Sequence, residues 1–117
     1  MLDIEQSIRN QIQSNPLLVY MKGTASFPQC GFSGRVVEIL ERCGAQYAYV
    51  NILEHPEIRR MLPIIADWPT FPQVYLNGVL IGGCDIVTEL FEEGELQTML
   101  EAAGVTGETA QGVAAKV

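Results

Sequence analysis

The sequence FPQCGFSGRVVEIL, residues 27–40, places a cysteine where a helix begins. After Cys30, apolar residues recur at the spacing of one helical face, at Phe32, Val36, Ile39, Leu40 and Cys43. Gly44 follows as a natural helix stop. The first turn of a helix presents unpaired N–H groups and the positive end of the dipole, which favour a thiolate over a thiol. We therefore expect a helix that starts at Cys30 and a thiol more acidic than that of a free cysteine.

Ser33 stands where a second cysteine would complete a redox pair with Cys30. Cys30 therefore lacks a neighbouring thiol that resolves a mixed disulfide. Lys22, one loop back, is expected to add positive charge near the same sulfur. The alternative is that Cys30 is a small buried apolar residue, as many free cysteines are. We favour a reactive thiol, because the Pro-x-Cys-Gly entry follows a predicted strand.

The flanking segments predict alternating strands and helices. Isoleucines at helical spacing predict a first amphipathic helix that ends at Ser14–Pro16. LLVYM at 17–21 and YAYVNI at 47–52 have the composition of buried strands. A further helix opens with Pro56. Helical spacing resumes over 84–104, with a break expected at Gly94.

The dipeptide Asn77-Gly78 lies between the strand-like segments QVYL and VLIG and predicts a two-residue hairpin turn. The last two strands are therefore antiparallel, whereas a strand, helix, strand order makes the first two parallel. Together these elements predict an α/β protein of the thioredoxin-like fold, with a four-stranded mixed sheet flanked by helices. We expect one domain at 1–104 and a disordered tail at 105–117.

Composition narrows the class of protein. The 117 residues are 48% hydrophobic and 18% charged, which is ordinary for a globular domain. A net charge of -7 argues against binding to nucleic acid or to an anionic membrane surface. No apolar run is long enough to span a bilayer, and acids occupy the start, MLDIEQSIRN, where a signal peptide would be basic. With three cysteines, an odd number, these features predict a cytoplasmic protein with free thiols.

For each of two further motifs, the residues alone allow two interpretations. WPTFPQ, residues 68–73, places Pro72 before a strand, either as an ordinary trans proline or with a cis bond that exposes the Phe71 backbone. GGCD, residues 82–85, is either a flexible turn or a helix start able to bind an anion. Cys84 within it is either a packing cysteine or a functional one. Cys43 is expected only to pack in the core.

Three motifs in order, MKGTASFPQCGFS, WPTFPQVYLNG and GGCDI, resemble the monothiol glutaredoxins of the short single-domain bacterial type, over residues 3–103. The resemblance implies that glutathione binds across the site. Lys22 and Arg59 would face its glycine carboxylate, and Phe71, before a cis proline, would pair with its cysteinyl backbone. Cys84 and Asp85 would hold its γ-glutamyl end. The implied binding set is completed by Cys30, Phe32, Thr70 and Pro72.

The same resemblance implies a function in iron–sulfur cluster assembly and iron homeostasis. A 2Fe-2S cluster needs four thiolates, and such proteins supply Cys30 of two subunits and two glutathione thiols. The expected protein is a homodimer when cluster-bound, transfers the cluster to apo proteins and pairs with a BolA-like partner. The rival interpretation is an enzyme, a glutathione-dependent oxidoreductase that uses the Cys30 thiolate as nucleophile. A third is an interaction module with an inert thiol.

Overall fold

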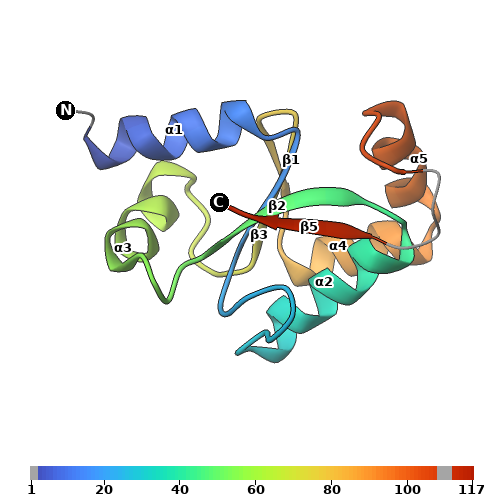
Figure 1. Cartoon of the computed structure of the whole chain (residues 1–117), viewed down its shortest axis with the longest axis horizontal. Helices are drawn as coiled ribbons and strands as arrows, with labels where there is room; N and C mark the ends of the chain where they lie inside the picture. Colours follow the sequence, from blue (N-terminus) through green and yellow to red (C-terminus); the bar gives the residue numbers. More distant parts are fainter. Residues whose placement is uncertain (1–2, 108–111) are drawn as a thin grey trace.

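The computed structural model describes residues 3–107 and 112–117. It shows a five-stranded mixed sheet with helices on both faces (Figure 1). Its elements, in chain order, are α1 (Ile4–Ser14), β1 (Leu17–Met21), α2 (Gly31–Arg42), β2 (Gln46–Asn51), α3 (Pro56–Ile65), β3 (Gln73–Leu76), β4 (Val79–Gly82), α4 (Cys84–Glu92), α5 (Glu95–Ala102) and β5 (Val113–Lys116). The predicted thioredoxin-like fold is confirmed.

The sheet has the strand order β4-β3-β1-β2-β5. The central strand β1 pairs with β2 in parallel and with β3 antiparallel, so that Val19 lies opposite both Tyr49 and Val74. All five residues of β1 are buried, as expected of a strand covered on both faces. The hairpin between β3 and β4 turns at Asn77 and Gly78, which have φ values of 50° and 82°. The predicted directions of all four strands are therefore correct.

The predicted sheet of four strands was one strand short. The fifth strand, β5, pairs in parallel with β2. Its sequence, Val-Ala-Ala-Lys, has neither strong β propensity nor an alternating pattern. Backbone contacts supply the pairing, since Val113 N–H donates to the Ala45 carbonyl at 2.8 Å and Val117 N–H to the Tyr49 carbonyl at 3.0 Å. Of the tail predicted to be disordered, residues 108–111 lie outside the described part of the chain.

Each face of the sheet has its own buried cluster. Side chains of α1 and α3 pack with those of β1 and β2 on one face, and include Ile8, Leu62 and Tyr20. On the other face α2, α4 and α5 cover the sheet (Figure 1), with Ile39 and Leu96 among the fully buried residues. The break at Gly94 between α4 and α5 is confirmed, because this glycine has a φ of 78° and precedes α5.

Phe32 does not lie on the buried face of α2, as its spacing predicted. Its side chain is 62% exposed, whereas Val36, Ile39 and Leu40 on the same helix are buried. Phe32 stands in the first turn of α2 and borders a pocket rather than the core. Helical spacing identifies the correct face but does not show where along the helix the covering sheet ends.

Candidate functional site

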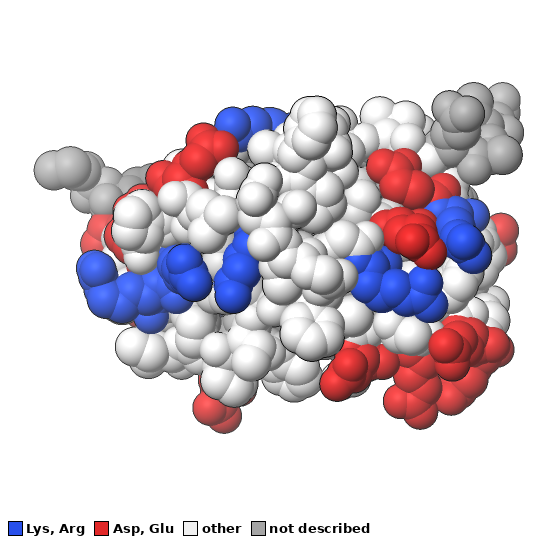
Figure 2. All heavy atoms as spheres, turned by 90° about the horizontal axis from the view of Figure 1, so that it is seen from below, with Lys and Arg blue, Asp and Glu red and all other residues white. Residues whose placement is uncertain are grey.

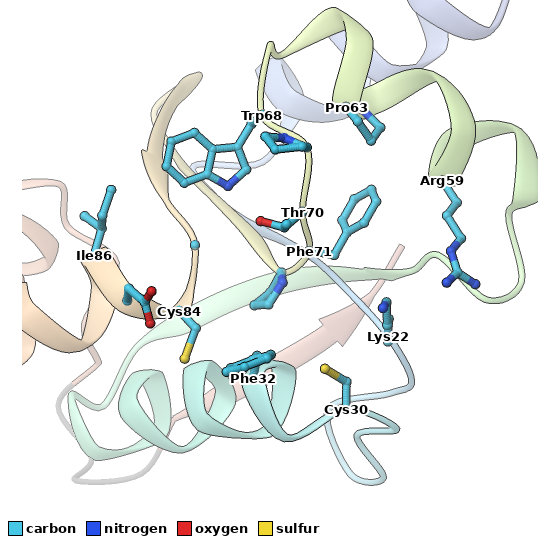
Figure 3. A pocket seen from close by; sticks show the side chains of 14 residues that line it. Lys22, Cys30, Phe32, Arg59, Pro63, Trp68, Thr70, Phe71, Cys84 and Ile86 are labelled. Atoms are coloured by element: carbon cyan, nitrogen blue, oxygen red, sulfur yellow. The ribbon is translucent and has the colours of Figure 1, made fainter.

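A pocket of about 740 Å³ opens where the starts of α2 and α4 approach α3 and the loop before β3 (Figure 3). All nine residues predicted for the site line this pocket: Lys22, Cys30, Phe32, Arg59, Thr70, Phe71, Pro72, Cys84 and Asp85. Five more residues complete the lining: Pro63, Trp68, Pro69, Gly83 and Ile86. Segments far apart in the sequence thus meet around one cavity of a size that suits a small-molecule ligand.

Cys30 is the N-cap residue of α2 and is partly exposed. The pKa of its thiol lies below the ordinary value for cysteine, chiefly because the Ser33 N–H donates toward the sulfur. The Phe32 N–H, the Lys22 ammonium and the Ser33 hydroxyl act in the same direction, and partial burial opposes them. The Ser33 and Phe32 N–H groups are the unpaired backbone donors of the first helical turn, and they explain why the thiol is acidic.

We expect Cys30 to be alkylated by iodoacetamide with a half-maximal rate at a lower pH than the thiol of a free cysteine peptide. The thiolate is the nucleophile, and a lowered pKa keeps the thiolate populated further into the acidic range. Cys43 should react slowest, because it is buried and burial raises its pKa. Mass spectrometry of trypsin-digested protein follows each cysteine separately. A Cys30 profile that matches the free peptide would contradict the assignment.

Ser33 is fully buried, although it is polar. Its hydroxyl oxygen accepts a hydrogen bond of 3.1 Å from the Lys22 N–H, and its side chain also lies against the Cys30 sulfur. The position next to Cys30 that a resolving thiol would occupy is therefore taken by a hydroxyl that joins α2 to the end of β1. The sequence indicated only that a second cysteine is absent there.

The loop between β1 and α2 is held at both of its ends. Gln29 N–H donates to the Lys22 carbonyl at 2.9 Å, and Gly23 forms an antiparallel bridge with Pro28. The Gly23 N–H donates to Asn51 Oδ1 at 2.9 Å, which ties the loop to the end of β2. These bonds fix Lys22 beside the pocket and Cys30 at the helix start.

Positive charge gathers at one end of the pocket. Figure 3 shows Lys22 and Arg59 on the same side of the cavity as Cys30. The chain as a whole has a net charge of -7. Figure 2 shows most Lys and Arg side chains of one face in two groups separated by uncharged surface, with a further one at the upper edge. The cations at the pocket suit an anionic group of a ligand.

The opposite end of the pocket is the start of α4. The N-cap residue of this helix is Gly83, so no side chain caps the helix start. Asp85 lies in the first turn. Cys84 lines the pocket with its sulfur 3.9 Å from the Thr88 hydroxyl oxygen. Figure 3 shows Cys84 and Cys30 on opposite sides of Phe32. Cys84 thus belongs to the pocket, whereas Cys43 is buried in the core as predicted.

Between these ends runs the backbone of residues 68–72, and the Phe71–Pro72 peptide bond is cis. The residues alone left this point open, and the family resemblance implied the cis form. Within residues 3–107 and 112–117, no group of three His, Cys, Asp or Glu side chains is placed to hold a metal ion. No helix in the described part of the chain is long and apolar enough to cross a bilayer.

A family model of glutaredoxin matches residues 17–81. The chain belongs to the glutaredoxin family. A curated relative, Glutaredoxin 4 of Pasteurella multocida, is 57% identical over 93 residues, which cover 80% of this chain and 85% of the relative. Glutaredoxin 4 of Escherichia coli K12 is 51% identical over 96 residues, which cover 82% and 84% of the two chains. The predicted resemblance to monothiol glutaredoxins is confirmed.

Solved glutaredoxin structures agree with this assignment. A truncated 1-C-Grx1 of Trypanosoma brucei superposes with a TM-score of 0.81 at 32% identity and covers 93% of this chain and 99% of its own. Reduced apo GrxS14 of poplar gives 0.74 at 44% identity, with 86% and 93% covered. A buckwheat glutaredoxin solved as a glutathione complex gives 0.77 at 30% identity, with 87% and 91% covered.

Five of the pocket residues of this glutaredoxin were not predicted. Trp68 and Pro69 lie within the quoted motif WPTFPQ, and Gly83 within GGCD, so the motifs contained a signal for them. Ile86 is the last residue of the quoted motif GGCDI, so it had a signal as well. Pro63 had none, because it lies inside α3 and outside all the quoted motifs. Its place in the pocket depends on how α3 is packed.

Proposed function

We propose that this glutaredoxin is a glutathione-dependent carrier that binds a 2Fe-2S cluster between two copies of the chain and passes it to apo iron–sulfur proteins. The observation that carries the proposal is that the buried hydroxyl of Ser33 lies beside Cys30, where a resolving thiol would otherwise stand. Ser33 is fully buried and bonded to the Lys22 backbone, so the acidic Cys30 thiol has no resolving thiol beside it. Such a thiol is suited to remain a ligand rather than to form an internal disulfide.

The number of thiolates explains why a second copy and glutathione are needed. A 2Fe-2S cluster takes four thiolate ligands. Cys30 is the proposed metal ligand of each copy, and the thiols of two bound glutathiones supply the remaining pair. Phe27 and Phe32, near Cys30 in the sequence, are 74% and 62% exposed. They offer apolar surface to a second copy, or to the BolA-like partner that we propose for the cluster-bound form.

In the proposed binding mode, the two ends of glutathione lie at opposite ends of the pocket. Its glycine carboxylate would bind the cations Lys22 and Arg59, and its cysteinyl unit would pair with the backbone at Phe71, as an extended peptide pairs with a strand edge. The γ-glutamyl carboxylate would then reach the N–H groups at the start of α4, with Asp85 near the amino group. Thr70 and Pro72 border the same path. The glutathione complex of the buckwheat relative supports this choice of ligand.

Replacing Arg59 by Gln should weaken glutathione binding by roughly three- to tenfold, because a charge-assisted contact to a carboxylate at an accessible site is worth about 1 kcal/mol. Arg60→Gln is the matched control. Arg60 is the next residue of α3, is exposed and does not line the pocket. Calorimetric titration should give Arg60→Gln an affinity within about twofold of the parent, and the loss in Arg59→Gln should shrink as salt rises. Equal losses in both variants would contradict the assigned carboxylate site.

The lowered pKa of Cys30 also favours a second candidate, a glutathione-dependent oxidoreductase. The Cys30 thiolate would attack the glutathione sulfur of a mixed disulfide and release the substrate thiolate. A second glutathione thiolate would then attack the Cys30 adduct, which gives oxidised glutathione and restores Cys30. The overall reaction is a thiol–disulfide exchange: the second glutathione thiol becomes a disulfide sulfur, the substrate sulfur becomes a thiol, and the sulfur of the first glutathione stays at the disulfide level. Three free cysteines favour a reducing cytoplasm as the location for either function.

A transfer experiment separates the two candidates. Cluster-loaded protein is mixed with an apo ferredoxin-type acceptor, and circular dichroism in the visible range follows the cluster. The same protein is assayed for turnover on a small glutathionylated disulfide. We expect rapid transfer and slow turnover, and rapid turnover without transfer would favour the oxidoreductase.

A further inference from the structure

Three polar side chains are buried in the part of the chain that the structure describes: Ser33, Asn51 and Gln73. Each of them makes a hydrogen bond to the backbone of a segment beside the pocket. Ser33 and Asn51 hold Lys22 and Gly23, as described above. Gln73 acts on the other wall of the pocket, and neither its burial nor its contacts follow from the motif in which it stands.

Gln73 is the first residue of β3 and its side chain has no exposed surface. Glutamine is mostly an exposed residue, so a fully buried one must have its polar atoms satisfied. Its Nε2 donates to the Trp68 carbonyl at 3.0 Å and to the Thr70 carbonyl at 3.3 Å. Both N–H bonds of the amide are therefore used, and both end on the loop that lines the pocket.

The orientation of the Gln73 amide is fixed from its other end. The Tyr75 hydroxyl donates to Gln73 Oε1 at 2.8 Å. The Tyr75 ring packs edge-on against Tyr20, with the ring centroids 5.8 Å apart. A flipped amide would set its oxygen against two carbonyl oxygens and lose both bonds, so the network allows one orientation. Gln73 is therefore a rigid double donor.

The consequence for the pocket follows from peptide geometry. In a trans peptide unit the carbonyl and the N–H point in opposite directions. The Thr70 carbonyl points inward to Gln73, so the N–H of the same unit, that of Phe71, points away from the core. Phe71 lines the pocket, and within residues 3–107 and 112–117 its N–H has no hydrogen-bond partner. It is thus available to a ligand.

We propose that Gln73 is a positioning residue: by holding the Trp68 and Thr70 carbonyls inward, its buried amide directs the Phe71 N–H into the pocket, where it binds the cysteinyl backbone of glutathione. This inference rests on the proposed glutathione site. It assigns no contact between Gln73 and the ligand, since the side chain is buried behind the loop.

The test uses Gln73→Met and a matched pair of tyrosine variants. Methionine keeps the length of the side chain and removes both donors. Tyr75→Phe removes the hydroxyl that orients Gln73, whereas Tyr20→Phe removes the hydroxyl of the facing ring, which donates to Gln11 Oε1 at 2.8 Å and does not touch the loop. Both tyrosine variants lose one hydrogen bond of the same kind, so a general loss of stability affects them alike.

Glutathione is titrated into each ¹⁵N-labelled protein while the Phe71 amide is followed by NMR. We expect binding roughly tenfold weaker in Gln73→Met, about two- to threefold weaker in Tyr75→Phe and unchanged in Tyr20→Phe, because a lost or misdirected hydrogen bond is worth about one factor of ten or less. Before any glutathione is added, the Phe71 amide should already be shifted in Gln73→Met and Tyr75→Phe.

The outcomes separate this inference from the proposed function. If the parent protein binds no glutathione, the proposed function fails and this inference fails with it. If the parent binds and Gln73→Met or, where that variant does not fold, Tyr75→Phe binds equally well, the positioning role alone is overturned. Equal weakening in Tyr75→Phe and Tyr20→Phe would also overturn it, because the loss would then follow stability and not the loop.

Discussion

The Cys30→Ser variant folds like the parent and retains no 2Fe-2S cluster. Cys30 is partly exposed at the start of α2, so its sulfur contributes little packing, and the change in unfolding free energy should stay within about 0.5 kcal/mol. A serine hydroxyl is not ionised at neutral pH and cannot replace a thiolate ligand. Visible absorbance after anaerobic reconstitution, with urea unfolding on the same sample, measures both effects.

Cys43→Ala is the matched control for this variant. Cys43 is 4% exposed and packs in the core beneath α2, so its truncation should cost about 1 kcal/mol of stability. The cluster should nevertheless be retained, because Cys43 does not line the pocket. A Cys30→Ser protein that still holds a full complement of cluster would show that Cys30 is not the ligand.

Gly23→Ala should destabilise the protein by about 2–4 kcal/mol and strongly weaken glutathione binding. Gly23 has a φ of 97°, which a residue with a Cβ seldom adopts. A Cβ at this position would lie 2.5 Å from the Gln29 nitrogen and 2.6 Å from the Phe27 carbonyl oxygen, and neither backbone atom can move without opening the loop. The loop that carries Lys22 and leads to Cys30 must then shift.

Gly78→Ala separates the steric effect from the conformational one. Gly78 also has a positive φ, 82°, but no atom lies within 4 Å of a Cβ placed there. Its substitution should cost only about 1 kcal/mol, which is the conformational penalty, and leave glutathione binding unchanged. Urea unfolding gives both free energies. Similar losses in the two variants would mean that the contacts of Gly23 do not constrain the site.

Local sequence patterns were sufficient for most of the fold. Apolar spacing located the helices, and Asn77-Gly78 set the antiparallel hairpin, because both signals act over a few residues. β5 was missed for the opposite reason. Its small residues have no pattern of their own, and its pairing with β2 joins residues more than sixty positions apart, such as Gln46 and Val113.

Most of the residues that line the candidate site could be predicted from the sequence, but the hydrogen bonds that hold them in place could not. Motifs gave Cys30, and its position at the helix start accounts for most of the lowered pKa of its thiol, with a smaller contribution from Lys22. The roles of Ser33 and Gln73 depend on burial and on bonds to other segments, which a single sequence does not show. The sequence indicated only that Ser33 replaces a second cysteine and that Gln73 is the last residue of the motif WPTFPQ.

The central claim is that Cys30 of two copies and two glutathiones hold one 2Fe-2S cluster, and anaerobic reconstitution tests it most directly. Iron and sulfide are added to the parent protein with and without glutathione, and visible absorbance is read together with molecular mass by light scattering. We predict colour that requires glutathione and elutes with a dimer containing two irons for every two chains. Colour that forms equally without glutathione, or that stays with a monomer, would contradict the claim.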